Sequence, residues 1–146
     1  MPRRMISQVI AGQTLLTASP ATSVRAAAEA MAERRVGAVL VLEAGRLAGI
    51  FTERDALTKV LAAGLDADAT SLAQVMVANP QTIAADKPLA YALLMMVDGG
   101  FRHVPVVDAA GVPIGMVSAR DALGQDMVEL ERDLDRLSEL EKSIGY

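Results

Sequence analysis

Cysteine and tryptophan are both missing from this 146-residue sequence, and histidine occurs once. Without cysteine the protein cannot form disulfides, zinc–thiolate sites or a cysteine nucleophile. One histidine also argues against a histidine-rich metal site. Aromatic residues make up only 3% of the chain, whereas hydrophobic residues make up 52%. The core must therefore be built largely from Ala, Val, Leu, Ile and Met.

Long apolar runs and an excess of positive charge are also missing. No apolar stretch approaches the roughly 18 residues that cross a bilayer, so we expect no membrane insertion. Residues 1–12 hold two arginines, but Ser7 and Gln8 interrupt their short apolar stretch, which is not the pattern of a signal peptide. The net charge of −4 argues against nucleic acid as a partner. We expect a cytoplasmic protein.

An internal repeat organises what is present. Gly49–Leu57 (GIFTERDAL) aligns with Gly115–Leu123 (GMVSARDAL), 66 residues further on. Upstream, a spacing of 65 aligns Thr17, Val24, Ala27, Met31, Val36 and Val39 with Thr82, Leu89, Ala92, Met96, Phe101 and Val104. The one-residue slip falls in segments that contain Gly45 and Gly111, as expected of tight turns that tolerate an insertion.

Each repeat predicts the element order β-α-β-β-α, and hence an α+β fold. A short extended piece precedes an amphipathic helix, two β-rich runs follow, and a second helix begins at Thr52 or Ser118. The β-rich runs are Val36–Leu42 with Leu47–Thr52, and His103–Val107 with Pro113–Ser118. We assign residues 5–64 to the first repeat, 71–124 to the second and 125–146 to a C-terminal amphipathic helix. Neither half of about 65 residues buries much core alone, so the halves should pack face to face.

These residues resemble the CBS domain pair, or Bateman module, a family named after the regulatory region of cystathionine β-synthase. The resemblance rests on Thr17–Val24, Val36–Val41 and Gly49–Asp55 in the first repeat, and on Phe101–Asp108 and Gly115–Asp121 in the second. The pattern Gly-h-x-Thr/Ser-x-x-Asp is short, but two copies, each ending the correct β-β-α unit, make the match specific. The resemblance implies tandem CBS repeats related by a pseudo-two-fold axis, a nucleotide-binding cleft between them, and frequent dimers.

Two Thr/Ser–Asp pairs are the first candidate site. Thr52 with Asp55, and Ser118 with Asp121, stand where a strand turns into a helix. One interpretation is a capping box, in which hydroxyl and carboxylate satisfy the first helical amides. The other is a ligand site, because a helix N-terminus binds phosphate and the resemblance implies that the Asp holds ribose.

Two short extended segments, each beside a predicted helix, are further candidates. For Thr17-Ala18 and Thr82-Ile83, the resemblance implies contacts between the backbone and adenine. The alternative is an ordinary edge of the core. Gly49 and Gly115 could keep the backbone clear of a ligand or could be twist points of a strand.

Four basic residues near the predicted cleft are candidate phosphate contacts. Arg102 and His103 begin a strand where the first repeat has Gly37-Ala38, so any phosphate contact there makes the two clefts unequal. An arginine fork matches phosphate oxygens, although a lone strand histidine is more often a packed side chain. Arg54 and Arg120 precede the two aspartates, and either face solvent, pair with acids or lean toward a phosphate.

The C-terminal segment Asp126–Ile144 has a helical stripe formed by Met127, Leu130, Leu134, Leu137, Leu140 and Ile144. The stripe favours an amphipathic helix that packs on a partner or on its own core, and the resemblance to dimeric modules favours a homodimer. A solvated, frayed tail is the alternative.

The sequence contains no nucleophile–base set, no P-loop and no Gly-x-Gly-x-x-Gly pattern, so we expect no enzyme, no metal and no cofactor. The resemblance instead implies a regulatory module that binds AMP, ADP, ATP or NAD(H) and controls a separate enzyme or transporter. Two alternatives stay open: a structural dimerising module with empty clefts, or a binder of S-adenosylmethionine.

Overall fold

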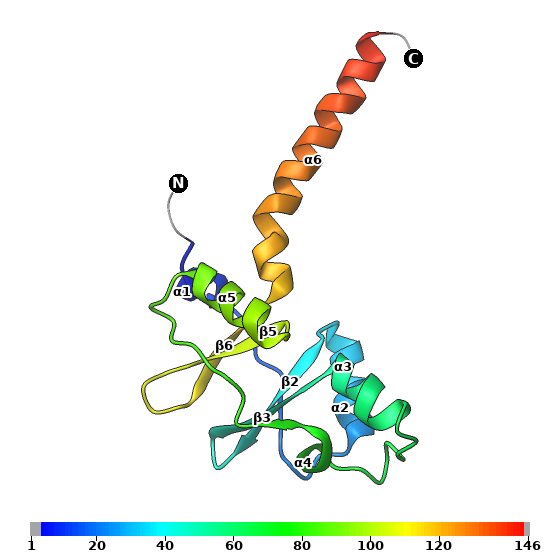
Figure 1. Ribbon diagram of the computed structural model, residues 1–146, viewed down its shortest axis with the longest axis vertical. Helices are drawn as coiled ribbons and strands as arrows, with labels where there is room; N and C mark the ends of the chain where they lie inside the picture. The colour runs from blue at the N-terminus through cyan, green and yellow to red at the C-terminus, as the bar shows by residue number, and fades with distance from the viewer. Residues whose placement is uncertain (1–3, 145–146) are drawn as a thin grey trace.

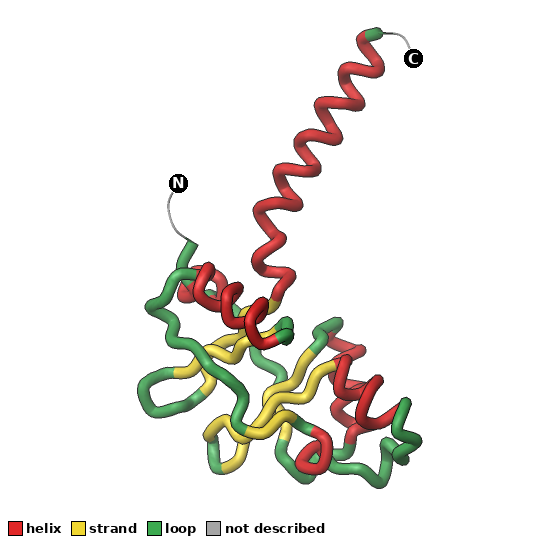
Figure 2. Tube along the Cα trace, in the orientation of Figure 1, coloured by secondary structure: helices red, strands yellow, loops and turns green. Residues whose placement is uncertain are grey.

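Two β-sheets lie side by side, and a long C-terminal helix projects from them (Figures 1 and 2). This computed structural model describes residues 4–144, without the side chains of residues 122, 123 and 125–131. It has the α+β architecture of two tandem repeats related by a pseudo-two-fold axis. None of the described helices is long and apolar enough to cross a membrane.

The first repeat forms a four-stranded sheet with helices on its outer side. Strand β1 (Thr17–Ala18) lies parallel to β2 (Ala38–Glu43), and β3 (Arg46–Thr52) lies antiparallel to β2. Helix α2 (Val24–Arg34) begins at Ser23, whose side chain accepts from the amide of Ala26. After β3 comes one turn of α-helix, α3 (Glu53–Asp55), continued by a π-helical turn, η1 (Ala56–Leu61).

The second repeat has the same order. Ile83 makes an isolated parallel bridge to Val106, at the place that β1 has in the first repeat. Helix α5 (Leu89–Gly99) leads to the antiparallel pair β5 (His103–Val107) and β6 (Pro113–Ser118), and α6 (Ala119–Ser143) follows. The predicted order β-α-β-β-α is therefore confirmed in both repeats.

The short helix that precedes each repeat packs on the other one. Helix α1 (Ile6–Ile10) contributes Ile6, which is fully buried, to the core of the second repeat. Helix α4 (Leu72–Val75) contributes Leu72 and Val75 to the core of the first, and β4 (Val77–Ala78) extends the first sheet alongside β3. The two repeats are thus tied together by an exchange of helices, and residues 5–64 do not pack as one separate unit.

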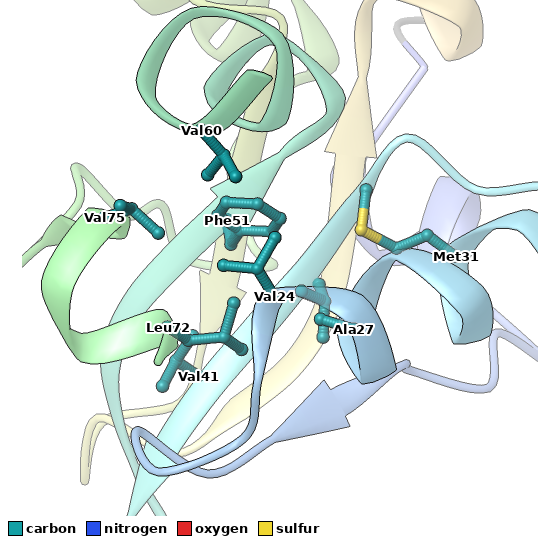
Figure 3. Packing of buried hydrophobic residues seen from close by; sticks show 9 residues of the cluster. Val24, Ala27, Met31, Val41, Phe51, Val60, Leu72 and Val75 are labelled. Atoms are coloured by element: carbon teal, nitrogen blue, oxygen red, sulfur yellow. The ribbon is translucent and has the colours of Figure 1, made fainter. Parts of the chain in front are cut away.

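The first core is built around Phe51, which is fully buried. Figure 3 shows Phe51 among aliphatic side chains from α2, the sheet, η1 and α4. Burying a side chain of this size stabilises the fold by about 1.5–3 kcal/mol. With one aromatic residue in a cluster of Val, Leu, Ala and Met, this core has the composition that the sequence predicted.

Gly49 and Gly115 allow the exchanged segments to approach the sheets. A Cβ atom at Gly49 would lie 2.5 Å from Sδ of Met76 and 2.9 Å from the carbonyl oxygen of Val77. A Cβ at Gly115 would lie 2.5 Å from the Ile10 side chain. Both glycines therefore make room for packing of the chain on itself, rather than for a ligand.

Candidate functional site

The end of β3 places Thr52 and Asp55 in a reciprocal capping box. The Thr52 amide and hydroxyl each donate to Oδ2 of Asp55 at 3.0 Å, and the Asp55 amide donates to the Thr52 hydroxyl at 3.2 Å. The ammonium of Lys59, one helical turn on, lies 3.2 Å from Oδ1. Asp55 is thereby held rigidly in a buried position, with both carboxylate oxygens oriented.

The same geometry recurs at the end of β6. The amide of Ser118 donates to Oδ2 of Asp121 at 2.7 Å, and its hydroxyl donates to the same oxygen at 3.2 Å. Both capping boxes that the sequence suggested are present. Helix capping and ligand binding are compatible, because a carboxylate has about four acceptor positions.

A cleft of about 1050 Å³ separates the two repeats beside Asp55. We call it the first cleft. One wall is the start of α3, a second is the segment between α5 and β5, and the third is the link after β4. It brings together five of the residues predicted from the sequence: Thr52, Arg54, Asp55, Arg102 and His103.

The other predicted residues do not line the first cleft. Thr17 and Ala18 pair with β2, and Ile83 lines a separate hollow of about 380 Å³ against α5. Thr82 lies between Gln81 and Ile83, which both line that hollow. Ser118, Arg120 and Asp121 lie at the end of β6 and the start of α6, beyond the cross-strand pair of His103 with Ser118.

Several lining residues were missed by the sequence analysis. Some are apolar or lie in irregular segments: Ile50, Leu57, Val77, Asn79, Pro80, Gln81, Gly99, Gly100 and Phe101. Another is Glu53, beside the predicted Arg54. A Cβ atom at Gly99 would collide with the Phe101 ring, so the position of this ring depends on the glycine two residues before it, which the sequence alone does not show.

Charge in the first cleft is close to balanced. Its lining includes two arginines, Arg54 and Arg102, and two acidic residues, Glu53 and Asp55. The guanidinium of Arg54 donates to the carbonyl oxygen of Gly100 at 3.3 Å, which joins the helix of the first repeat to the end of α5. The guanidinium of Arg102, unlike that of Arg54, makes no hydrogen bond to any of the described residues. A phosphate would therefore not have to displace a protein acceptor to bind it.

His103 lies where the two repeats meet. Burial lowers its pKa below the ordinary value of 6.5, while the carboxylates of Glu53 and Asp121 act in the opposite direction. The guanidinium groups of Arg120 and Arg102 add to the lowering. His103 is therefore mainly neutral at pH 7, and can offer a neutral donor and acceptor to a ligand.

The CBS domain profile matches residues 5–62 and 72–126. The chain belongs to the CBS domain family. Curated relatives of this CBS pair include the Meiotically up-regulated gene 70 protein of Schizosaccharomyces pombe, 42% identical over 97 residues, or 66% of this chain and 13% of that protein. The CBS domain-containing protein CBSX3, mitochondrial, of Arabidopsis thaliana is 33% identical over 117 residues, 77% of this chain and 56% of that protein.

This chain spans only 13–24% of the length of the first several curated relatives. Solved structures match it more completely. A CBS domain protein from Pyrobaculum aerophilum complexed with AMP has a TM-score of 0.77 at 25% identity, over 87% of this chain and 96% of that one. The CBS domain pair of protein MJ0100, in complex with 5′-methylthioadenosine and S-adenosyl-L-methionine, has a TM-score of 0.77 at 22% identity, over 88% and 99%. At that identity, the likeness to MJ0100 shows the fold alone.

Proposed function

We propose that this CBS pair is a regulatory module that binds an adenosine-type nucleotide, such as AMP, ADP, ATP or NAD(H), in the first cleft. The observation that carries the proposal is the buried carboxylate of Asp55, fixed by Thr52 and Lys59 in the wall of a cleft that also holds Arg102. Ribose hydroxyls and a phosphate are the groups that such a pair recognises.

The lining offers a surface for each part of a nucleotide. Asp55 has three of about four acceptor positions occupied by Thr52 and Lys59, which leaves one for a ribose hydroxyl. Arg102, with His103 beside it, is the proposed phosphate contact. The apolar surfaces of Ile50, Leu57 and Phe101 are suited to the base, since adenine binds by stacking and apolar contact.

The CBS domain protein of Pyrobaculum aerophilum complexed with AMP supports this choice of ligand. The action of the module is proposed to fall on a separate enzyme or transporter in the cytoplasm, with no catalysis in the module itself. We also propose that Thr17-Ala18, Thr82-Ile83 and Arg120 contribute to folding rather than to the first cleft, because none of them lines it.

A thermal-shift panel tests the proposal, because a ligand that binds only the native state raises the melting temperature. The panel contains AMP, ADP, ATP, NAD, NADH and S-adenosylmethionine, with GMP as the control for the base. At a ligand concentration 100 times Kd the stabilisation is about 2.7 kcal/mol. We expect a rise with at least one adenine nucleotide and a smaller one with the 2′,3′-dideoxy form of it.

A rise with S-adenosylmethionine alone would replace the proposed ligand class. No rise with any compound would favour the structural module with empty clefts. An equal rise with the ribose and dideoxy forms would contradict the role of Asp55.

A further inference from the structure

The repeat predicts a second cleft at the place related to the first by the pseudo-two-fold axis. Its helix start is Ser118–Asp121, where the first cleft has Thr52–Asp55. Its other walls are the end of α2 and the link before β1. At the 65-residue spacing, Arg34 is the counterpart of Gly99, and Thr14 and Leu15 are the counterparts of Asn79 and Pro80.

Arg34 spans two of these walls. Its guanidinium donates to the carbonyl oxygen of Thr14 at 2.6 Å and to that of Leu15 at 3.3 Å. In the first cleft, the counterparts of all three residues line open space. There, Gly99 has no side chain to reach Asn79 or Pro80, so the walls stay apart.

Gln13 joins the link before β1 to strand β6. Its side-chain nitrogen donates to the carbonyl oxygen of Met116, and its side-chain oxygen accepts from the Met116 amide, both at 2.9 Å. Met116 is the counterpart of Ile50, which lines the first cleft and pairs with Val77 through the backbone. The sheet edge is therefore paired in both repeats, whereas the bridge that Arg34 makes to Thr14 and Leu15 has no equivalent at Gly99 in the first cleft.

We infer that Arg34 shuts the second cleft, so that each chain binds a single nucleotide, in the first cleft. The inference rests on the proposed function, since it assigns the stoichiometry of the same ligand. Asp121 keeps the geometry of Asp55, and its site is therefore latent rather than lost. Arg34 is a residue that determines which cleft is used, although it touches no ligand in the first.

Equilibrium calorimetry with AMP up to about 1 mM, which half-saturates a millimolar site, tests this inference. We expect one site per chain in the unmodified protein and two in Arg34→Ala. Adding Asp121→Ala to Arg34→Ala should return the count to one. Arg25→Ala is the matched control, because Arg25 is also an exposed arginine of α2 but bonds to Asp68. It should keep one site.

Arg34→Met guards against a folding defect in the alanine variant, since methionine favours helix and cannot donate to Thr14 or Leu15. Two sites in the unmodified protein, or one site in both folded Arg34 variants, would overturn the inference and leave nucleotide binding intact. The absence of binding by AMP, ADP, ATP and NAD(H) alike in every variant would instead overturn the proposed function, and this inference with it.

Discussion

At the scale of single residues, the candidate site is built from groups that also hold the fold. Asp55 caps a helix and faces the first cleft, so its position is fixed before any ligand arrives. His103 lines the same cleft and lies under the influence of charges from both repeats. The chain thus places its only histidine at a point where protonation affects both stability and the cleft.

Acid should destabilise the protein through His103. The pKa of His103 is lowered in the folded state, so the unfolded chain binds a proton first as the pH falls below the ordinary value. The contribution of neutral His103 to the free energy of unfolding is therefore complete above pH 6.5, and it is lost as the pH falls from 6.5 toward the folded-state pKa. The charged groups that act on the pKa of His103 are Glu53 from α3, Asp121 and Arg120 from α6, and the adjoining Arg102.

Melting temperatures between about pH 7.5 and about pH 5, on either side of the ordinary histidine pKa, measure this effect. We expect the unmodified protein to lose more stability over that range than His103→Ala, which copies Ala38 of the first repeat. An equal loss in the two proteins would show that His103 is protonated as easily in the folded state as in the unfolded chain.

Residues with local roles could be predicted from sequence. The hydroxyl and carboxylate of a capping box are three residues apart, so the pairs Thr52–Asp55 and Ser118–Asp121 were recognisable without a structure. Glu53, Phe101 and Arg34 were not, because their roles depend on which distant segment faces them. Arg34 in particular differs from other exposed helix arginines only through its contacts with Thr14 and Leu15.

At the scale of elements, the repeat predicted the order but not the exchange of helices. The apolar residues of α1 have helical spacing, but that spacing carries no information about which core they enter. The decision is made by contacts far apart in sequence, such as the amide of Ile6 donating to the carbonyl oxygen of Lys87 at 3.0 Å. Strand β4 was missed for the same reason, since two residues are too few for a periodic pattern.

Helix α6 leaves the body of the molecule with an apolar stripe exposed. It has 25 residues, or about 37 Å at 1.5 Å per residue, and projects away from both sheets (Figure 1). Leu134 and Leu137 are each 57% exposed, and Ile144 is 65% exposed. Met127 and Leu130, predicted on the same stripe, lie outside the described side chains. The stripe residues Leu134, Leu137, Leu140 and Ile144 follow one another at spacings of three, three and four residues, which suits packing against a second copy of the same helix.

We predict a homodimer that depends on this stripe. Light scattering at about 100 μM, far above the Kd of a micromolar complex, should give twice the mass of one chain. Leu134→Glu with Leu137→Glu should yield monomers, because charged residues at the seam oppose helix pairing. The control, Arg132→Glu with Glu139→Arg, keeps the net charge on the opposite face and should stay dimeric. A monomeric unmodified protein would contradict the prediction.

At the scale of the whole molecule, two nearly equal repeats place different residues around their two helix starts, Thr52–Asp55 and Ser118–Asp121. The sequence predicted unequal clefts only on the condition that Arg102 or His103, which replace Gly37 and Ala38, contacts a phosphate. The structure adds the replacement of Gly99 by Arg34 and the contact of Gln13 with Met116. The two repeats thus keep the pseudo-two-fold symmetry of the fold, while the proposed ligand contacts all lie in the first cleft.

The most direct test of nucleotide binding in the first cleft is calorimetry of Asp55→Ala with the nucleotide that gives the largest thermal shift. Loss of a hydrogen bond to a charged group costs about 1.5–3 kcal/mol, so affinity should fall about 10- to 150-fold. Asp121→Ala is the matched control: it removes the same kind of helix cap, which costs about 0.5–2 kcal/mol of stability, but from the other repeat. It should bind as the unmodified protein does. Unchanged affinity in folded Asp55→Ala would contradict the account and leave Asp55 as a helix cap alone.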